Sequence, residues 1–321
     1  MVQALVSAEE RPDVVGCHRP ANLSVFAFAD GVDYNDGVAA ATSEVEGLSV
    51  LVTGGGTGIG AGIAARLAHD GATVTICGRT EHTLQSTAEA VNLAAGREAV
   101  AFSVADVTVE DDVVRTVAAA ASRTGRLDGV VANAGGGGAL LPIHLQELAD
   151  FERVLKLNVV GTMLLAKHSI PYFSRQGGGS FVGISSIAGH VTHPYFGAYP
   201  VSKAALEELI RNAADEYGEA NIRFNAVRPG LTMTELLSML TPDSPVYQSY
   251  DENTPLGGGS EVDDVAQLVE FLLSARSSRM TGQIINVDGG FGLRRGPDWS
   301  SVVEPLIGGR DVALGRTDRS S

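Results

Sequence analysis

Short apolar runs alternate with amphipathic segments along most of this 321-residue chain. Apolar runs between turn residues are typical of buried strands, whereas apolar positions three and four residues apart indicate helices. Strands are predicted at 48–52, 73–77, 99–104, 127–132, 180–184, 222–227 and 283–287. Helices are predicted at 61–70, 81–95, 110–124, 199–217 and 261–273, with a long one that contains Asn158 and ends near 171–173. The alternation predicts an α/β fold, a single domain on a Rossmann-type doubly wound parallel sheet.

Three regions fall outside this alternation. Residues 1–46 mix charged and apolar stretches and are expected to form a loosely ordered extension, or an arm over a neighbouring subunit. Residues 231–255, rich in Leu, Met, Thr and Pro, are expected to be irregular. Residues 292–321 are polar and glycine-rich, which predicts a mobile C-terminal tail. The predicted domain therefore spans 47–291.

Composition narrows the classes of partner. The net charge of -15 gives no electrostatic support for binding nucleic acid or an anionic membrane, and no apolar run is long enough to span a bilayer. The two cysteines, Cys17 and Cys77, are too few for a disulfide framework, and Cys77 falls in a predicted strand. The N-terminus lacks the basic and apolar regions of a secretory signal, so a cytoplasmic location is expected.

The most informative chemistry lies at Tyr199 and Lys203. Residues four apart on a helix share one face, and a lysine ammonium beside a tyrosine favours the phenolate and lowers its pKa. Such a pair is suited to exchange a proton with a carbonyl or alcohol oxygen. The chain has only three lysines, so Lys203 is less readily explained as a surface charge.

A glycine-rich turn supplies the matching cofactor signal. The segment Thr53–Gly60 reads TGGGTGIG and lies between a predicted strand and a predicted helix. In that context the glycines allow a tight turn and close approach of the backbone to a pyrophosphate, which then lies at the helix N-terminus. A glycine cluster without the flanking elements would indicate no more than a flexible loop.

These motifs resemble those of the short-chain dehydrogenases/reductases, in the shorter branch that includes 3-oxoacyl-ACP reductase-like members. The resemblance covers about residues 48–290. Its landmarks, in order, are the glycine motif, Asn133-Ala134-Gly135, the tetrad of Asn158, Ser186, Tyr199 and Lys203, Arg228-Pro229-Gly230, and Asn286 to Gly290. One departure is Ala132, where the family often has a second Asn. The resemblance implies an active reductase that uses a nicotinamide cofactor. It also implies assembly as a homodimer or homotetramer.

The resemblance also implies roles for the tetrad. Tyr199 is expected to be the general acid, and Ser186 to donate a hydrogen bond to the substrate oxygen. Lys203 is expected to bind the nicotinamide ribose, and Asn158 to kink its helix and hold a water in a proton relay. Each residue also has an ordinary structural reading, so the expectation rests on their joint occurrence.

The choice of cofactor depends on the end of the second strand. NAD-binding relatives usually place an acid there for the ribose hydroxyls, whereas this chain has Gly78 followed by Arg79. An arginine suits a 2′-phosphate, although it can also stack on adenine, so NADP(H) is favoured and NAD(H) remains open. The predicted cofactor residues are Gly54, Thr57, Gly58, Ile59, Gly60, Arg79, Thr80, Asp106, Val107, Asn133, Ala134, Gly135, Tyr199, Lys203, Pro229, Gly230, Thr232 and Thr234.

The sequence predicts an NADP(H)-dependent oxidoreductase that interconverts a ketone and a secondary alcohol. His190 and His193 lack metal-ligand spacing and are expected at the pocket rim, with Tyr195 and Phe196. A partly apolar substrate such as a 3-oxoacyl group is one interpretation of the nearby apolar residues, which are Leu231, Met233, Leu236, Leu237 and Met239. Their packing within a loop helix is the other interpretation. A catalytically idle NADP-binding regulator, an NAD-dependent alcohol dehydrogenase and an enoyl reductase remain as alternatives, though enoyl reductases usually have a longer Tyr–Lys spacing.

Overall fold

The predicted parallel sheet is present. The computed structural model describes residues 44–234, 240–294, 296 and 298–317. Seven strands pair in the order β3-β2-β1-β4-β5-β6-β7, and every pairing is parallel. Their bounds are Ser49–Thr53 (β1), Thr73–Gly78 (β2), Val100–Val104 (β3), Gly129–Ala132 (β4), Gly179–Ile184 (β5), Ile222–Pro229 (β6) and Ile284–Val287 (β7). The strand order reverses direction between β1 and β4, where folds of this type bind ligands beyond the carboxyl ends.

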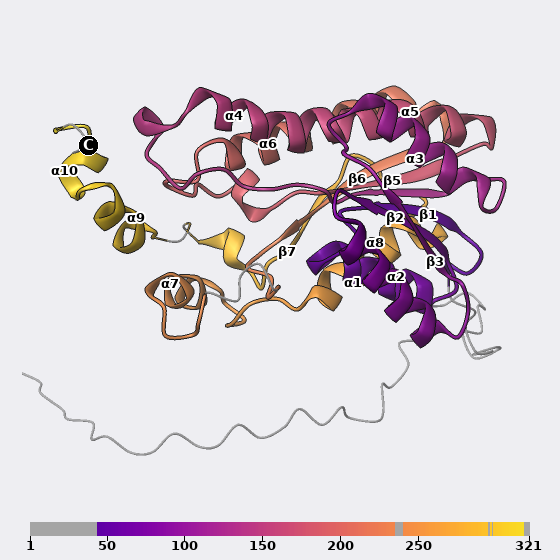
Figure 1. The fold of residues 1–321 in the computed structure, drawn as a ribbon, viewed down its shortest axis with the longest axis horizontal. Coiled ribbons are helices and arrows are strands. Elements are labelled where there is room, and N and C mark those ends of the chain that lie inside the picture. Colours follow the sequence, from indigo (N-terminus) through magenta and orange to yellow (C-terminus); the bar gives the residue numbers. More distant parts are fainter. Residues whose placement is uncertain (1–43, 235–239, 295, 297, 318–321) are drawn as a thin grey trace, which may run out of the picture. The chain divides into compact units, whose positions relative to one another are not determined.

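Helices cover both faces of the sheet (Figure 1). One face carries α1 (Gly58–His69), α2 (Glu81–Ala95) and α8 (Val262–Leu273). The other carries α3 (Glu110–Ser122), α4 (Leu148–Leu155), α5 (Gly161–Arg175) and α6 (Ala198–Tyr217). None of the helices in the described segments is long and apolar enough to cross a membrane.

The alternation of side chains along the strands explains the two layers. In β1, Val50 and Val52 pack into the core under α1, α2 and α8, whereas Leu51 between them packs into the opposite core. All three side chains are fully buried. Strands buried on both faces are continuous apolar runs, which is why the sequence shows runs and not alternation. Cys77 in β2 is buried and unpaired, as its strand position predicted, while Cys17 lies outside the described residues.

The long helix predicted around Asn158 is interrupted at that residue. It consists of α4 and α5 joined by a π-helical turn at Lys156–Val160, with Asn158 at the centre of that turn. The helix also continues to Arg175 and includes Pro171, which the sequence had placed at its end. A π turn leaves the apolar spacing almost unchanged, so periodicity alone does not reveal it.

Part of the region expected to be irregular is helical. Helix α7 spans Pro245–Asn253 and is capped by Ser244, whose side chain accepts a hydrogen bond from the Tyr247 amide at 3.2 Å. Val246 and Tyr250 form its buried face. A serine cap followed by proline at the first helical position is a helix-start signal that the composition of this stretch obscured. Residues 235–239, which include Leu236, Leu237 and Met239, lie outside the described residues.

The described part of the C-terminal segment also differs from the expected mobile tail. It forms α9 (Ser300–Ile307) and α10 (Arg310–Ala313), and Val303, Ile307 and Val312 are buried. The apolar residues were hidden among glycines and charges, but they share one face once the chain coils. In Figure 1, α7, α9 and α10 lie beyond the sheet on the side toward which β6 and β7 lead.

Candidate active site

Hydrogen bonds join the glycine turn after β1 to the end of β4. The Thr53 hydroxyl accepts hydrogen bonds from the backbone amides of Asn133 (3.1 Å) and Ala134 (3.0 Å). The Asn133 side-chain amide donates to the carbonyl of Thr53 at 2.9 Å. A Cβ on Gly60 would lie 2.3 Å from the Gly54 carbonyl and 2.5 Å from Asn133 Nδ2, so only glycine fits there. Asn133 therefore fixes the turn, which the sequence reading had not assigned to it.

The N-terminus of α1 opens onto this turn. Its capping residue, Thr57, is exposed and makes no side-chain hydrogen bond to the helix, and no side chain of the described segments hydrogen-bonds to the first-turn amides. Gly58 adopts a φ of +54° and lies opposite Thr234, while Ile59 packs on the core below. A glycine turn followed by an open helix N-terminus fits a dinucleotide pyrophosphate.

The expected adenosine side of the site lies at the ends of β2 and β3. Arg79 and Thr80 follow β2 and are exposed, and Arg79 forms no ion pair with the described residues. After β3, Asp106 accepts a hydrogen bond from the Thr108 amide at 2.8 Å, which fixes that turn. Val107 is buried and would contact any Cβ placed on Gly161, so it packs beneath α5. Contacts of these residues with a cofactor stay predictions.

The Asn158 side chain, at the centre of the π turn, bonds to Gly136 and Ser202. Its Oδ1 accepts from the Gly136 amide at 2.9 Å, and its Nδ2 donates to the Gly136 carbonyl at 3.0 Å and to Ser202 Oγ at 2.8 Å. The residue is buried. These bonds connect the loop after β4 to α6, the helix that carries Tyr199 and Lys203. The predicted kink at Asn158 is present as the π turn, whereas a water relay stays a prediction.

Lys203 is buried and points toward the same loop. Its Nζ donates to the Ile184 carbonyl at the end of β5 at 2.8 Å and lies 5.6 Å from the centre of the Tyr199 ring. A Cβ on Gly135 would lie 3.0 Å from Asn158 Oδ1 and 3.3 Å from this Nζ, so three landmarks meet at one point. Burial lowers the pKa of Lys203 to about 8, and the negative charge of Glu207 opposes that shift.

Ser186 and Tyr199 complete the tetrad. Ser186 follows β5, and its hydroxyl accepts from the Ala188 amide at 3.2 Å. Burial raises the pKa of Tyr199, while hydrogen bonding with the Ser186 side chain opposes the rise. The sequence reading expected Lys203 to lower this pKa. In this structure the ammonium is directed to the Ile184 carbonyl, so burial dominates.

A buried ion pair behind the tetrad was missed by sequence reasoning. Glu207, one helical turn after Lys203, accepts hydrogen bonds from Ser185 Oγ at 2.7 Å and Arg228 Nε at 2.6 Å. The Glu207 side chain is only 3% exposed and that of Arg228 12%. The pair joins α6 to the ends of β5 and β6. The sequence feature that could have indicated this ion pair was Arg228 in the Arg228-Pro229-Gly230 landmark, for which no partner had been predicted.

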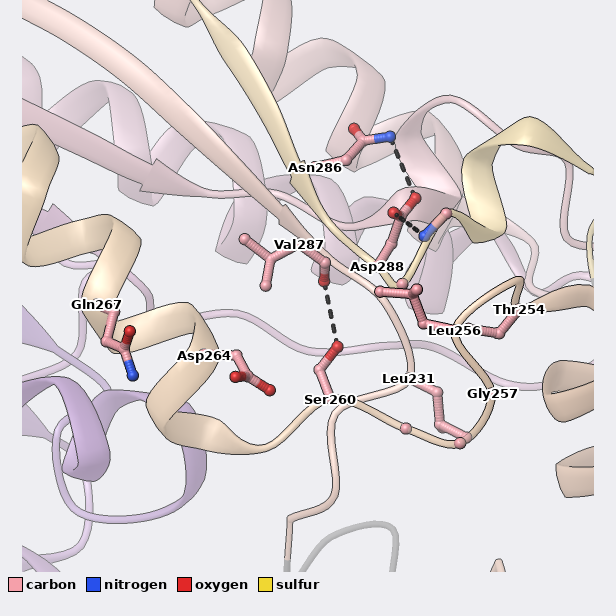
Figure 2. A pocket seen from close by; sticks show the side chains of 14 residues that line it. Leu231, Thr254, Leu256, Gly257, Ser260, Asp264, Gln267, Asn286, Val287 and Asp288 are labelled. Atoms are coloured by element: carbon pink, nitrogen blue, oxygen red, sulfur yellow. Dashed lines mark hydrogen bonds between the residues drawn. The ribbon is translucent and has the colours of Figure 1, made fainter. Parts of the chain in front are cut away.

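The loop after β6 contributes the last predicted cofactor residues. Pro229, the last residue of β6, and Thr232 are buried, and a Cβ on Gly230 would lie 2.8 Å from the Asp288 backbone, so glycine is required there. A hollow of about 530 Å³ lies next to this loop and is lined by Leu231, Ser260 and the residues around Asp288, whose side chains are drawn in Figure 2. No tetrad residue lines that hollow, so it is separate from the proposed reaction centre.

Phe196 connects Tyr199 to a cluster of aromatic rings. Phe196 lies 6.2 Å from Tyr199 and 5.3 Å from His193 between ring centres. His193 also contacts Tyr250 of α7 at 6.3 Å, and burial lowers its pKa. His193 is thus buried among rings, whereas His190 is exposed. An aromatic wall of this kind favours a partly apolar substrate.

Comparison with known proteins supports the resemblance. A family model described as enoyl-(acyl carrier protein) reductase matches residues 54–292. A cis-4-hydroxycyclohexanecarboxylate dehydrogenase of Sinomonas cyclohexanicum is 36% identical over 241 residues, which cover 75% of this chain and 95% of the relative.

Two solved structures extend the comparison. A short-chain type dehydrogenase/reductase from Mycobacterium ulcerans is 45% identical, with a TM-score of 0.82 over 84% of this chain and 98% of that one. A 7α-hydroxysteroid dehydrogenase, solved with NADH and 7-oxo glycochenodeoxycholic acid, is 32% identical, with a TM-score of 0.73 over 78% and 96%. With its parallel sheet, glycine turn and tetrad, the chain belongs to the short-chain dehydrogenase/reductase family and is an oxidoreductase that acts on CH–OH groups with NAD(P).

Proposed function

We propose that this protein is an NADP(H)-dependent oxidoreductase that interconverts a partly apolar ketone and its secondary alcohol. The observation that carries the proposal is the convergence of Ser186, Tyr199 and Lys203 beside the loop after β4. Ser186 follows β5, whereas Tyr199 and Lys203 share α6, and the three form one proton-transfer site beside Gly135. An idle binding protein has no need of such an arrangement.

Each tetrad residue has a role in that reaction. Tyr199 gives its proton to the carbonyl oxygen during reduction, and the raised pKa keeps it protonated at neutral pH. Ser186 donates a hydrogen bond to the same oxygen as negative charge develops on it. Lys203 places a positive charge near Tyr199, and Asn158 holds the loop and helix in register. Bound nicotinamide supplies or accepts the hydride.

The preference for NADP(H) rests on the end of β2. Gly78 offers no carboxylate to the ribose hydroxyls, and the exposed Arg79 is available for a 2′-phosphate. NAD(H) is the second candidate because the related 7α-hydroxysteroid dehydrogenase was solved with NADH. Enoyl reduction, the activity in the family model's description, is disfavoured by the short spacing of Tyr199 and Lys203.

We also propose a homodimer or homotetramer that uses the α4–α6 face. Val160, Met163 and Val201 on this face are 38%, 37% and 49% exposed, although they are apolar. Covering such residues by a second copy removes apolar surface from water. Light scattering of the full chain tests this, and a monomer at working concentration overturns it.

The reaction is tested with a substrate panel. The full chain is incubated with NADPH or NADH and with cyclic ketones, 3-oxoacyl thioesters, linear ketones and an enoyl thioester, and loss of nicotinamide absorbance is followed. We expect turnover of cyclic or other partly apolar ketones, faster with NADPH. Turnover of the enoyl thioester alone, or of no substrate with either cofactor, would overturn the proposed reaction.

A further inference from the structure

Two successive turns of α6 contact the end of β5. Lys203 Nζ donates to the last carbonyl of β5 at 2.8 Å, and Glu207 Oε1 accepts from Ser185 Oγ at 2.7 Å. All three side chains are buried. The residue after Ser185 is Ser186, whose side chain hydrogen-bonds with Tyr199, one turn before Lys203 on the same helix. Glu207 therefore fixes the residue that precedes the proposed catalytic serine.

Two further elements hold the Glu207 carboxylate in place. Arg228 of β6 donates to Glu207 Oε1 through Nε at 2.6 Å and to Oε2 through Nη2. A Cβ on Gly189, in the short turn Ile187–Gly189 that follows Ser186, would lie 2.8 Å from Glu207 Oε1. This turn therefore packs directly on the carboxylate. Because a two-pronged arginine contact is directional as well as strong, it fixes the carboxylate against which both segments next to the serine pack.

The charge of Glu207 also acts on Lys203. Burial lowers the pKa of Lys203 to about 8, and the negative charge of Glu207 opposes that shift. The other nearby groups that can carry a charge are Tyr199 and Arg211 on α6 and Arg228 on β6. The π turn and the loop after β4 place the neutral Asn158 side chain and backbone groups against this face. Glu207 is the acid that favours the ammonium form of Lys203.

These contacts bear on the step in which Tyr199 gives up its proton. Negative charge then develops on Tyr199, and the Lys203 Nζ lies 5.6 Å from the centre of its ring. Building on the proposed ketone reduction, we propose that Glu207 is a positioning residue for that reaction. Through Ser185 it fixes Ser186 opposite Tyr199, and through its charge it supports the Lys203 ammonium. The alternative is an ion pair with Arg228 that only stabilises the fold.

The first test breaks the contact to Ser185 and leaves the ion pair intact. Ser185→Ala is compared with Ser180→Ala, because Ser180 is also a buried serine of the β5 segment and its hydroxyl donates to the Leu272 carbonyl at 2.8 Å. A catalytic group displaced by about 1 Å can cost about 10²-fold, so we expect kcat for ketone reduction to fall roughly 10- to 100-fold in Ser185→Ala. Ser180→Ala should keep the wild-type kcat, and both should keep the KM for NADPH. Equal kcat values for the two variants overturn the proposal.

The second test removes the charge and keeps the shape. Glu207→Gln retains an oxygen that can accept from Ser185, and Glu208→Gln is the control because the Glu208 side chain is 66% exposed. Reduction should slow as pH rises through the pKa of Lys203, about 8 in wild type, because the ammonium is lost. In Glu207→Gln, the missing negative charge and the uncompensated Arg228 both lower that pKa, so the decline should shift to lower pH. A purely structural ion pair would change stability alone, so identical pH profiles for wild type and Glu207→Gln overturn the proposal.

The two variants keep the proposal testable whatever their stability. Ser185→Ala leaves the Glu207–Arg228 pair in place, so its kcat decides the matter even if Glu207→Gln does not fold. Absence of wild-type turnover with every ketone and both cofactors refutes the proposed function, and this role with it. An active wild type whose kcat is unchanged in Ser185→Ala refutes the positioning role alone, so the two failures are distinguishable.

Discussion

The cofactor side and the substrate side of this site are held together by different forces. On the cofactor side, short polar side chains bond to backbone groups at strand ends, as Thr53 does with Asn133 and Asn158 with Gly136. On the substrate side, an apolar cluster around Val303 and Ile307 and one Tyr195–Glu304 bond hold loops and terminal helices. The first arrangement needs particular residues at fixed spacings, whereas the second needs only apolar side chains of suitable size. Motifs therefore mark one side and not the other.

The largest effect is expected on the cofactor side, where Tyr199→Phe removes the transferred proton. General acid catalysis contributes about 10²–10⁴-fold, so kcat should fall by at least that range. NADPH affinity should stay nearly constant, because the ring and Lys203 remain. Tyr217→Phe, at the other end of α6, is the matched control and should be fully active. Steady-state kinetics and cofactor titration check both, and an active Tyr199→Phe variant would refute the mechanism.

Glu207→Ala tests whether the buried ion pair supports the cofactor side. Removing one partner leaves Arg228 buried without its counter-charge, which costs about 3–5 kcal/mol. The neighbouring Glu208 side chain is 66% exposed, so Glu208→Ala should change stability by less than about 1 kcal/mol. Urea unfolding of the three proteins measures the difference. Equal stabilities would show that the pair is dispensable.

Lys203 should make stability depend on pH. Its pKa is lowered from 10.5 to about 8, so the folded state loses its proton before the unfolded state does. The cost of burying the ammonium, roughly 3 kcal/mol, is fully present below pH 8 and disappears as pH rises toward 10.5. Lys203→Met should therefore gain stability over wild type at pH 7 and lose that gain by pH 10. Urea unfolding of both proteins at pH 7 and pH 10 measures this difference. A stability difference that does not change with pH would contradict the lowered pKa of Lys203.

The smallest effect is expected for Arg79, at the adenosine end of the cofactor side. Arg79→Ala should remove a charge-assisted hydrogen bond to the 2′-phosphate, worth about 1.5–3 kcal/mol, and raise the KM for NADPH by about one to two decades. The KM for NADH should hardly change, since that cofactor lacks the phosphate. Arg115→Ala, another exposed arginine, serves as the control. Equal losses with both cofactors would identify Arg79 as an adenine-stacking or surface residue.

The tetrad, the glycine turn and the order of strands and helices were predictable from the sequence, because local chemistry dictates them. A strand followed by TGGGTGIG indicates a nucleotide-binding turn within a few residues, whereas the Tyr and Lys four apart became informative only together with the other landmarks. The family resemblance predicted a kink at Asn158, but the apolar spacing predicted neither its π-helical form nor helix α7, since each depends on backbone hydrogen bonds that leave little trace in that spacing.

Tertiary structure alone decided the rest. Glu207 and Arg228 are 21 residues apart, and Tyr195 and Glu304 are 109 apart, so no local pattern joins them. The C-terminal segment reads as a polar tail because its few apolar residues find their partners only on a distant loop. The sequence determined which reaction the chain is equipped for, because the glycine motif and the tetrad residues occur together in one order along the chain. The fold decided what encloses the substrate, because those contacts join segments that are far apart along the chain.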